Sequence, residues 1–111
     1  MQPAYRIRKN GHFQYVYRKG KGTAVPTLSL SYVRAGRLQV GFSVSKKVGK
    51  AVVRNLIKRR MREAFRGMIP QLKPGYYVFT ARPAAAQADY WQLRQDMQKV
   101  LKRMQLLAEQ P

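Results

Sequence analysis

Cysteine is absent from this 111-residue chain, and acidic residues are scarce, with four Asp and Glu against 23 Lys and Arg. Without cysteine the chain has no disulfide, no thiolate metal ligand and no thiol nucleophile. Four carboxylates (Glu63, Asp89, Asp96 and Glu109) and one imidazole (His12) leave few groups that could bind a catalytic metal or activate water. The sequence therefore argues against an enzyme whose own side chains carry out hydrolysis.

Long hydrophobic runs are missing as well. Residues 1–22 contain Pro3 and six scattered basic residues, with no continuous apolar segment. We therefore expect neither a secretory signal nor a membrane-spanning helix, and we expect a cytoplasmic protein with no membrane partner. Glycine-rich phosphate loops and dinucleotide-binding fingerprints are also missing from the sequence.

Positive charge dominates what is present. The formal net charge of +19 points to nucleic acid as the partner, with an anionic membrane surface as the weaker alternative. A chain of this length predicts a single domain, residues 1–111, with one modest core. Residues 1–8 show no clear periodicity, and we expect them to form a mobile basic arm.

The most strongly basic stretch is residues 46–66, with nine basic residues and one acid. Helical residues four apart lie on one face. The basic face predicted in this way consists of Lys50, Arg54, Lys58, Arg62 and Arg66, flanked by Asn55 and Arg59. The neighbouring sector is apolar, as in a helix that packs one side on a core, and comprises Val53, Ile57, Met61, Ala64, Phe65 and Met68.

Such a basic face could simply be solvated. Like charges four residues apart cost an isolated helix roughly 0.2–0.5 kcal/mol per pair. Solvated faces usually interleave Glu with Lys, whereas Glu63 alone interrupts this run. We therefore favour a polyanionic partner that neutralises the face.

Hydrophobic periodicity divides the rest of the chain into short elements. Residues 10–19 fit a helix, residues 76–81 a strand, and residues 89–108 a long helix capped by Asp89. Residues 27–33 and 38–45 alternate with period two around a turn, which predicts an antiparallel hairpin. A short strand near residues 23–25 would extend the sheet. The order helix, strands, helix, strand, helix predicts an α+β domain with about four strands.

Three features admit both a structural and a binding interpretation. Phe13 and Tyr17 share one helix face and could pack on the core or contact bases. One face of the predicted sheet has small polar residues, including Ser31 and Ser43, and could be solvated or hold an extended nucleic-acid strand. We expect Trp91 to be a packing anchor, because it lies beside the apolar stripe of the last helix.

Residues 46–63 read KKVGKAVVRNLIKRRMRE. This motif resembles the signature helix of the protein component of bacterial ribonuclease P, and it fixes many positions over a short span. The resemblance extends from Lys9 to about Leu107. Leu56 departs from the pattern, because many members of the family carry a second arginine directly after the asparagine.

The resemblance implies a mixed sheet with a left-handed βαβ crossover. It also implies a subunit of an endoribonuclease that removes the 5′ leader from precursor tRNA. The RNA subunit performs the hydrolysis with Mg²⁺ bound chiefly by the RNA subunit and the substrate, so no catalytic residue is expected in the protein. The implied partners are the catalytic RNA, in a 1:1 complex, and precursor tRNA.

The resemblance also assigns candidate binding residues. By match to the motif, the residues that would contact the catalytic RNA or the substrate are Lys47, Arg54, Asn55, Lys58, Arg59 and Arg62. We add the other cations of the run, Lys46, Lys50 and Arg66. The family likeness favours the binding interpretation of Phe13 and Tyr17, which with Ser31 and Ser43 are predicted to contact the single-stranded leader.

Two other classes of protein remain to be compared with this interpretation. A basic ribosomal or chromosome-associated protein would explain the charge and the scarcity of acids, but not the fixed spacing from Lys46 to Asn55. A self-sufficient nuclease would require carboxylates that this sequence does not group together.

Overall fold

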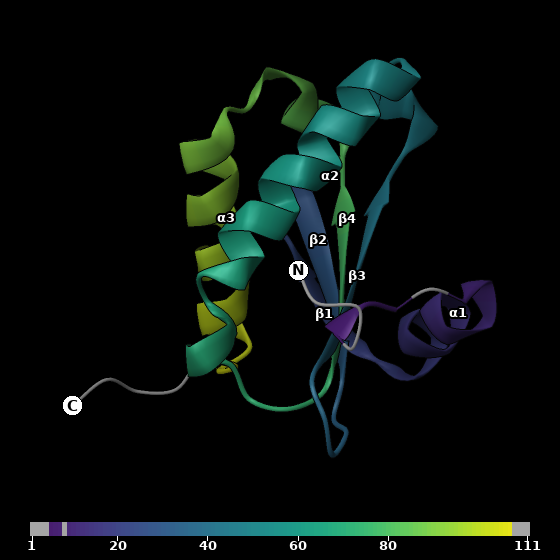
Figure 1. The fold of residues 1–111 in the computed structure, drawn as a ribbon, viewed down its shortest axis with the longest axis vertical. Helices are drawn as coiled ribbons and strands as arrows, with labels where there is room; N and C mark the ends of the chain where they lie inside the picture. The colour runs from purple at the N-terminus through teal and green to yellow at the C-terminus, as the bar shows by residue number, and fades with distance from the viewer. Residues whose placement is uncertain (1–4, 8, 108–111) are drawn as a thin grey trace.

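The structure, a computed structural model, describes residues 5–7 and 9–107. Helix α1 lies on one side of a sheet, and α2 and α3 lie on the other (Figure 1). The elements are α1 (Asn10–Lys19), β1 (Lys21–Ala24), β2 (Leu28–Val33), β3 (Gln39–Val44), α2 (Ala51–Arg66), β4 (Tyr76–Ala81) and α3 (Tyr90–Arg103), with short 3₁₀ turns η2 (Lys46–Val48), η3 (Ile69–Gln71) and η4 (Pro83–Gln87). The α+β class and the order of elements predicted from the sequence are confirmed. In the described ranges no helix combines the length and the apolar character needed to cross a bilayer.

Strands β2 and β3 do not pair with each other. The strand order is β1-β2-β4-β3, so that β4 lies between them, antiparallel to β2 and parallel to β3. The predicted antiparallel hairpin of residues 27–33 and 38–45 is therefore wrong, although both strands form. Alternation along a strand indicates which residues face the core, but not which strand is the neighbour.

Strand β4 takes a central position because both of its faces are apolar. Tyr77, Phe79 and Ala81 are buried on the face toward α2 and α3, and Val78 is buried on the face toward α1. A strand covered on both faces reads as a nearly continuous hydrophobic run rather than as an alternating one. The sequence YYVFTA has this character.

Helix α2 connects the parallel strands β3 and β4. In Figure 1 both strands run upward, α2 crosses in front of them, and β4 lies to the left of β3. This arrangement makes the crossover left-handed, whereas nearly all such βαβ connections are right-handed. The left-handed crossover agrees with the expectation that came from the family resemblance.

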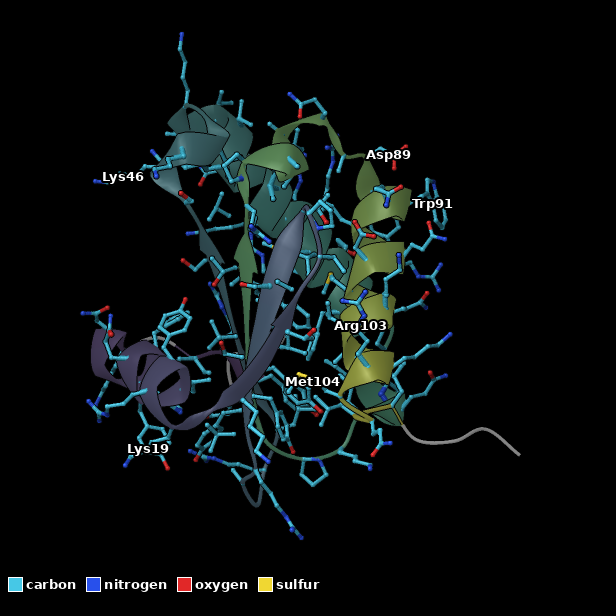
Figure 2. The ribbon with its side chains drawn as sticks, turned by 180° about the vertical axis from the view of Figure 1, so that it is seen from behind. Lys19, Lys46, Asp89, Trp91, Arg103 and Met104 are labelled. Atoms are coloured by element: carbon cyan, nitrogen blue, oxygen red, sulfur yellow. The ribbon has the colours of Figure 1, made fainter. Side chains whose placement is uncertain are left out.

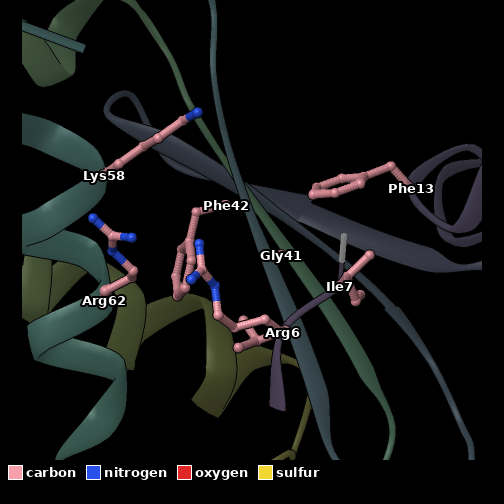
Figure 3. Close-up of a pocket in the computed structure, with 8 residues that line it drawn as sticks. Arg6, Ile7, Phe13, Gly41, Phe42, Lys58 and Arg62 are labelled. Carbon is pink, nitrogen blue, oxygen red and sulfur yellow. The ribbon is translucent and has the colours of Figure 1, made fainter. Parts of the chain in front are cut away.

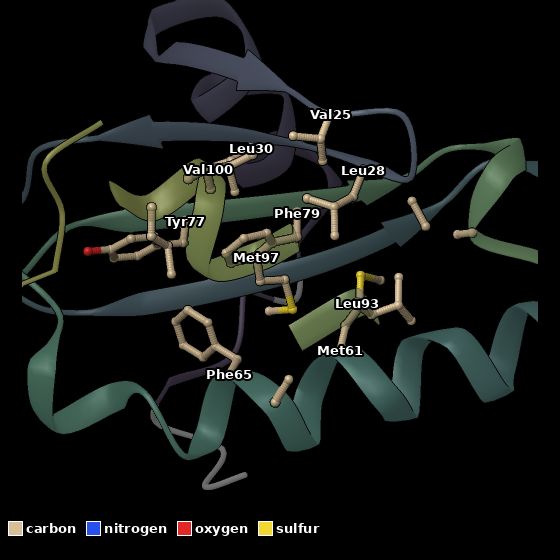
Figure 4. Close-up of a cluster of buried hydrophobic side chains, with 14 of the residues drawn as sticks. Val25, Leu28, Leu30, Met61, Phe65, Tyr77, Phe79, Leu93, Met97 and Val100 are labelled. Atoms are coloured by element: carbon tan, nitrogen blue, oxygen red, sulfur yellow. The ribbon is translucent and has the colours of Figure 1, made fainter. Parts of the chain in front are cut away.

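An aromatic cluster joins α2 to the sheet. Phe65 of α2 makes edge-to-face contacts with Phe42, Tyr77 and Phe79, whose ring centroids lie 5.9, 5.7 and 5.6 Å away. Burial raises the pKa of Tyr77 well above its ordinary value, and the hydroxyl donates to the Lys73 carbonyl oxygen at 2.6 Å. Figure 4 shows Phe65, Tyr77 and Phe79 together with Leu93, Met97 and Val100 of α3. The buried residues of α3 are Leu93, Asp96, Met97, Val100 and Leu101.

The opposite face of the sheet is only partly polar. Val16 of α1 is fully buried and packs with Val78 and Ile7 in a second apolar cluster. Phe13 packs against the same cluster and is half-buried. Helix α1 therefore covers part of the face that was expected to carry small polar residues.

Part of the N-terminal segment is attached to the edge of β3. The Ile7 backbone N–H donates to the Val40 carbonyl oxygen at 2.8 Å, and Arg6 forms a parallel bridge with the same residue. The expectation of a mobile arm over residues 1–8 does not hold for residues 5–7, whereas residues 1–4 and 8 lie outside the described residues.

Polar contacts fix the start and the middle of α3. The Asp89 carboxylate accepts from the Gln92 backbone N–H at 2.8 Å, which confirms the predicted cap. Asp96 is buried, and its two oxygens accept from the Thr27 hydroxyl at 2.5 Å and from the Gln92 side-chain amide at 3.0 Å. This buried carboxyl thus has a partner for each oxygen, and it connects α3 to the start of β2.

Replacing Thr27 with valine removes one donor to Asp96 while keeping nearly the same side-chain shape. We expect the free energy of unfolding to fall by about 1–3 kcal/mol, because a buried acceptor loses its partner. Urea denaturation measures the loss, and Thr27→Ser, which keeps the hydroxyl, is the control. No loss in Thr27→Val together with a clear loss in Thr27→Ser would show that the methyl group, rather than the hydroxyl, stabilises this contact.

Candidate nucleic-acid interface

Helix α2 turns its basic side chains away from the core. The buried residues that fix the rotation of the helix are Ile57, Met61, Ala64 and Phe65. Arg54, Lys58 and Arg62 are half-buried beside this apolar stripe, and Asn55 and Arg59 are exposed. The amphipathic helix predicted from the sequence is therefore present, with a cationic side open to a partner.

The basic run is divided between a turn and a helix. Lys46 and Lys47 are exposed in η2, and Lys50 is the exposed N-cap of α2. Gly49 separates the two elements with φ at 155°, in the left-handed region that favours glycine. The Arg54 Nε donates to the Gly49 carbonyl oxygen at 3.2 Å, which fixes this guanidinium against the turn.

Two further arginines of the run are engaged within the protein. Arg66 forms an exposed ion pair with Glu63 at 3.4 Å. Arg60, which was not among the predicted binding residues, donates from Nη1 to the Ala88 carbonyl oxygen at 3.0 Å and so holds the segment before α3. Of the two, Arg66 alone retains an exposed position on the basic side.

A cavity of about 310 Å³ lies between α1, the edge of β3 and α2 (Figure 3). Phe13 of α1 stands on one side of it, and Lys58 and Arg62 of α2 stand on the other. The cavity is lined by Arg6, Ile7, Phe13, Val40, Gly41, Phe42, Lys58 and Arg62. It therefore places an aromatic ring opposite two cations, and none of these described lining residues is acidic.

Gly41 allows the close approach of α1 to β3. A Cβ atom added at this position would lie 2.5 Å from the Phe13 ring, which is too close for any real side chain. The smallest residue is therefore required here for Phe13 to reach its observed place. The sequence pattern alone does not reveal this contact.

Arg6 is a site residue that sequence reasoning missed. It lines both the cavity beside Phe13 and a smaller one of about 170 Å³, which is formed with Arg59, Arg62 and Glu63. Three guanidinium groups gathered around one space suit a phosphate, which arginine can bind with two parallel hydrogen bonds. Apart from its charge, Arg6 carries no motif that could have identified it.

The four residues predicted to contact a leader are only partly brought together. Phe13 lines the cavity that it forms with Lys58 and Arg62. Tyr17 is 41% exposed, and its hydroxyl lies 3.0 Å from Thr80 Oγ1 on β4, the register partner of Ser43 on β3. Ser31 lies on β2, which β4 separates from β3. The structure thus connects Tyr17 to Ser43 through Thr80, whereas Phe13 lies at the cavity and Ser31 on a separate strand.

The carboxylates of the described residues are scattered. No group of three or more Asp, Glu or His side chains within residues 5–7 and 9–107 could hold a metal ion. Glu63 pairs with Arg66, Asp89 caps α3, and Asp96 is occupied by two donors. The chemistry available in the cavity beside Phe13 is the binding of an anion beside an aromatic surface. The fold and this cleft define a small, basic α+β protein of the nucleic-acid-binding class.

Comparison with known proteins gives the family. The family described as Ribonuclease P matches residues 1–105. The "Ribonuclease P protein component" of Listeria innocua is 38% identical over 100% of this chain and 97% of its own length, and that of Caldanaerobacter subterraneus subsp. tengcongensis is 42% identical over 94% and 92%. The chain belongs to the family of bacterial ribonuclease P protein components. It is therefore a subunit of an endoribonuclease that acts in tRNA processing, with an RNA subunit as its partner.

Solved structures agree with this assignment. The RNase P protein of Staphylococcus aureus superposes with a TM-score of 0.87 at 33% identity, covering 93% of this chain and 97% of that one. The RNase P protein of Thermotoga maritima gives a TM-score of 0.79 at 28% identity, covering 88% and 96%.

The contact between Gly41 and Phe13 can be tested by substitution. We expect Gly41→Ala to lower the free energy of unfolding by about 1–3 kcal/mol, because the added methyl group collides with the ring. Adding Phe13→Ala should remove the collision, so that the double variant loses less than the sum of the single losses. Thermal or urea unfolding measures all three.

The matched control for this cycle is Gly36→Ala, because no atom lies within 4 Å of a methyl group added there. It should change stability little. Strictly additive losses for Gly41→Ala and Phe13→Ala would contradict the proposed contact.

Proposed function

We propose that this subunit binds the catalytic RNA with the cationic side of η2 and α2 and holds the unpaired 5′ leader of precursor tRNA in the cleft beside Phe13. The observation that carries the proposal is the arrangement of the cavity beside Phe13, with Phe13 facing Lys58 and Arg62. Bases of a single strand can stack on an aromatic ring while neighbouring cations neutralise the backbone.

The stacking energy and the phosphate contacts that this cavity offers support the assignment. Base stacking on an aromatic side chain contributes about 1–3 kcal/mol per base and tolerates any base identity. Lys58 supplies a flexible contact to phosphate, and Arg62 can bind phosphate with two parallel hydrogen bonds. Such contacts suit a leader whose sequence varies from one precursor to the next, because they read the backbone and the ring faces rather than base edges.

Hydrolysis is proposed to take place on the RNA subunit. The described residues offer no cluster of carboxylates of the kind that holds a catalytic metal. We therefore assign Mg²⁺ to the RNA subunit and the substrate phosphates, which supply the oxygen ligands that this ion prefers. The protein's role is to screen phosphate repulsion and to position the substrate, in a 1:1 complex with the RNA subunit in the cytoplasm.

The leader contact predicts a selective loss of affinity. Phe13→Ala should weaken the binding of leader-bearing precursor tRNA by the reconstituted holoenzyme several-fold or more, while the binding of mature tRNA changes little. Equilibrium binding of the two RNAs measures the difference.

Tyr15→Ala is the matched control, because Tyr15 is an exposed aromatic residue on α1 that points about 200° away from Phe13 around the helix. It should leave both affinities unchanged. If Phe13→Ala weakens precursor and mature tRNA equally, the ring supports the fold rather than the leader.

The phosphate contacts predict a change in salt dependence. Each duplex phosphate neutralised contributes about 0.9 to the slope of log affinity against log salt concentration. The double variant Lys58→Ala/Arg62→Ala should therefore flatten the slope for the RNA subunit with bound precursor by about 1–2.

The control for charge alone is Arg34→Ala/Arg37→Ala, which removes two exposed cations from the β2–β3 loop. We expect a smaller change in slope from this pair. The same change from both pairs would mean that net charge, rather than the cleft, determines the affinity.

A further inference from the structure

Trp91 is an exposed aromatic residue that the cleft does not use. It lies in the first turn of α3 and is 66% exposed, so the expectation of a packing anchor is wrong. The reason is its helix position, because the buried stripe of α3 begins two residues later, at Leu93. Figure 2 shows Trp91 on the outer side of α3, whereas α1 lies on the other side of the molecule.

The ring is held in place although it is exposed. The Tyr90 ring meets it edge-to-face with centroids 5.1 Å apart, and the Arg94 guanidinium carbon lies 5.8 Å from its centroid. The Asp89 cap fixes the backbone of the same turn. A ring oriented in this way loses little rotamer freedom when a partner binds, which favours its use as a contact surface.

The surroundings of Trp91 are cationic and polar. Exposed basic residues follow it along the helix at Arg94, Lys99 and Lys102, with Gln92 and Gln95 between them. The acids of this helix region are already engaged, since Asp89 caps the helix and Asp96 is buried. Among the described residues, the other exposed large hydrophobic side chains are Tyr15, Tyr17 and Val52, none of which belongs to α3.

An exposed indole among cations and amides favours one kind of partner. A second copy of a chain with a net charge of +19 would be repelled. A membrane-binding helix presents a continuous apolar face, whereas here a single aromatic side chain lies among amides and cations. An unpaired nucleotide fits both features, because its base can stack on the indole and its phosphate can approach Arg94.

We propose that Trp91 and Arg94 form a second RNA contact, in which the indole stacks on an unpaired base. The inference rests on the proposed function only in that the partner is RNA. The cleft lies at the β3 edge of the sheet, whereas α3 packs over β2 and β1 toward the opposite edge and carries Trp91 on its outer side (Figure 2). The nucleotide at Trp91 therefore belongs to a different RNA segment from the one beside Phe13. That segment comes from either the RNA subunit or the precursor tRNA, and the two sources are separated by the experiment.

Trp91 is the chain's single tryptophan, so its fluorescence reports on this site alone. The full chain is titrated separately with a bacterial ribonuclease P RNA, precursor tRNA, a short oligouridylate and a blunt RNA duplex. Stacking should quench the emission and protect it from acrylamide with the oligouridylate and with whichever natural RNA supplies the segment. The duplex, whose bases are already stacked, should bind without quenching.

Substitution supplies the second measurement. Trp91→Ala should weaken the binding of the RNA that quenches by about 5- to 140-fold, as expected for the loss of one stacked base. Trp91→Phe should retain most of the affinity, and Tyr15→Ala is the matched control for loss of an exposed aromatic residue. Circular dichroism establishes that each variant is folded, which is expected because the ring is largely outside the core.

Each outcome decides the proposal. Unchanged emission with every RNA, or equal affinity of Trp91→Ala and the unsubstituted chain, would overturn it. A blue shift with phosphatidylglycerol vesicles and no quenching by RNA would assign the surface to membranes and overturn it as well. If precursor cleavage is stimulated while the emission stays constant, the proposed function stands and this contact fails. If the emission is quenched while cleavage is not stimulated, this contact stands and the proposed function fails.

Discussion

The contact between Phe65 and the aromatic residues of β3 and β4 is the interaction on which the binding surface depends. Phe65 is fully buried against Phe42, Tyr77 and Phe79, and it fixes the rotation of α2 over the two parallel strands. With this side of the helix in the core, Lys58 and Arg62 must lie at the flank that faces α1. Loss of the aromatic contact would therefore affect the cleft as well as the core.

The second constraint is electrostatic repulsion. The chain carries 23 cations and four acids, and in the described residues the single ion pair, Arg66 with Glu63, is exposed. An exposed pair contributes about 0–1 kcal/mol, so it offsets little of the repulsion. A polyanion that binds the folded state relieves this repulsion and stabilises the fold through mass action. The charge of the protein therefore favours a polyanionic partner.

Much of the fold could be predicted from the sequence, because local periodicity determines each element. The buried stripe of α2 and the cap at Asp89 follow directly from residue spacing. Strand adjacency could not be predicted in this way, since β4 enters between two strands that are neighbours in the sequence. The central place of β4 depends on its burial on both faces, which becomes evident only when α1 and α2 are placed on opposite sides of the sheet.

The sequence predicted the charged residues of the candidate site but not the other residues that line it. The cations of α2 carry a motif, whereas Arg6 and Gly41 join the cleft through contacts between distant parts of the chain. Trp91 illustrates the opposite error, because proximity to an apolar stripe does not establish which way a ring points. For Arg6 and Gly41 the missing information was the position of a second element, which no local pattern contains.

The most direct test of the account is the cleavage of precursor tRNA by a bacterial ribonuclease P RNA at low Mg²⁺ concentration, with and without this protein. At low Mg²⁺ the phosphate repulsion between RNA subunit and substrate is poorly screened, so the protein's cations should have their largest effect. The account predicts strong stimulation of cleavage and no cleavage by the protein alone. Cleavage by the protein without RNA, or tight RNA binding without any stimulation, would contradict it.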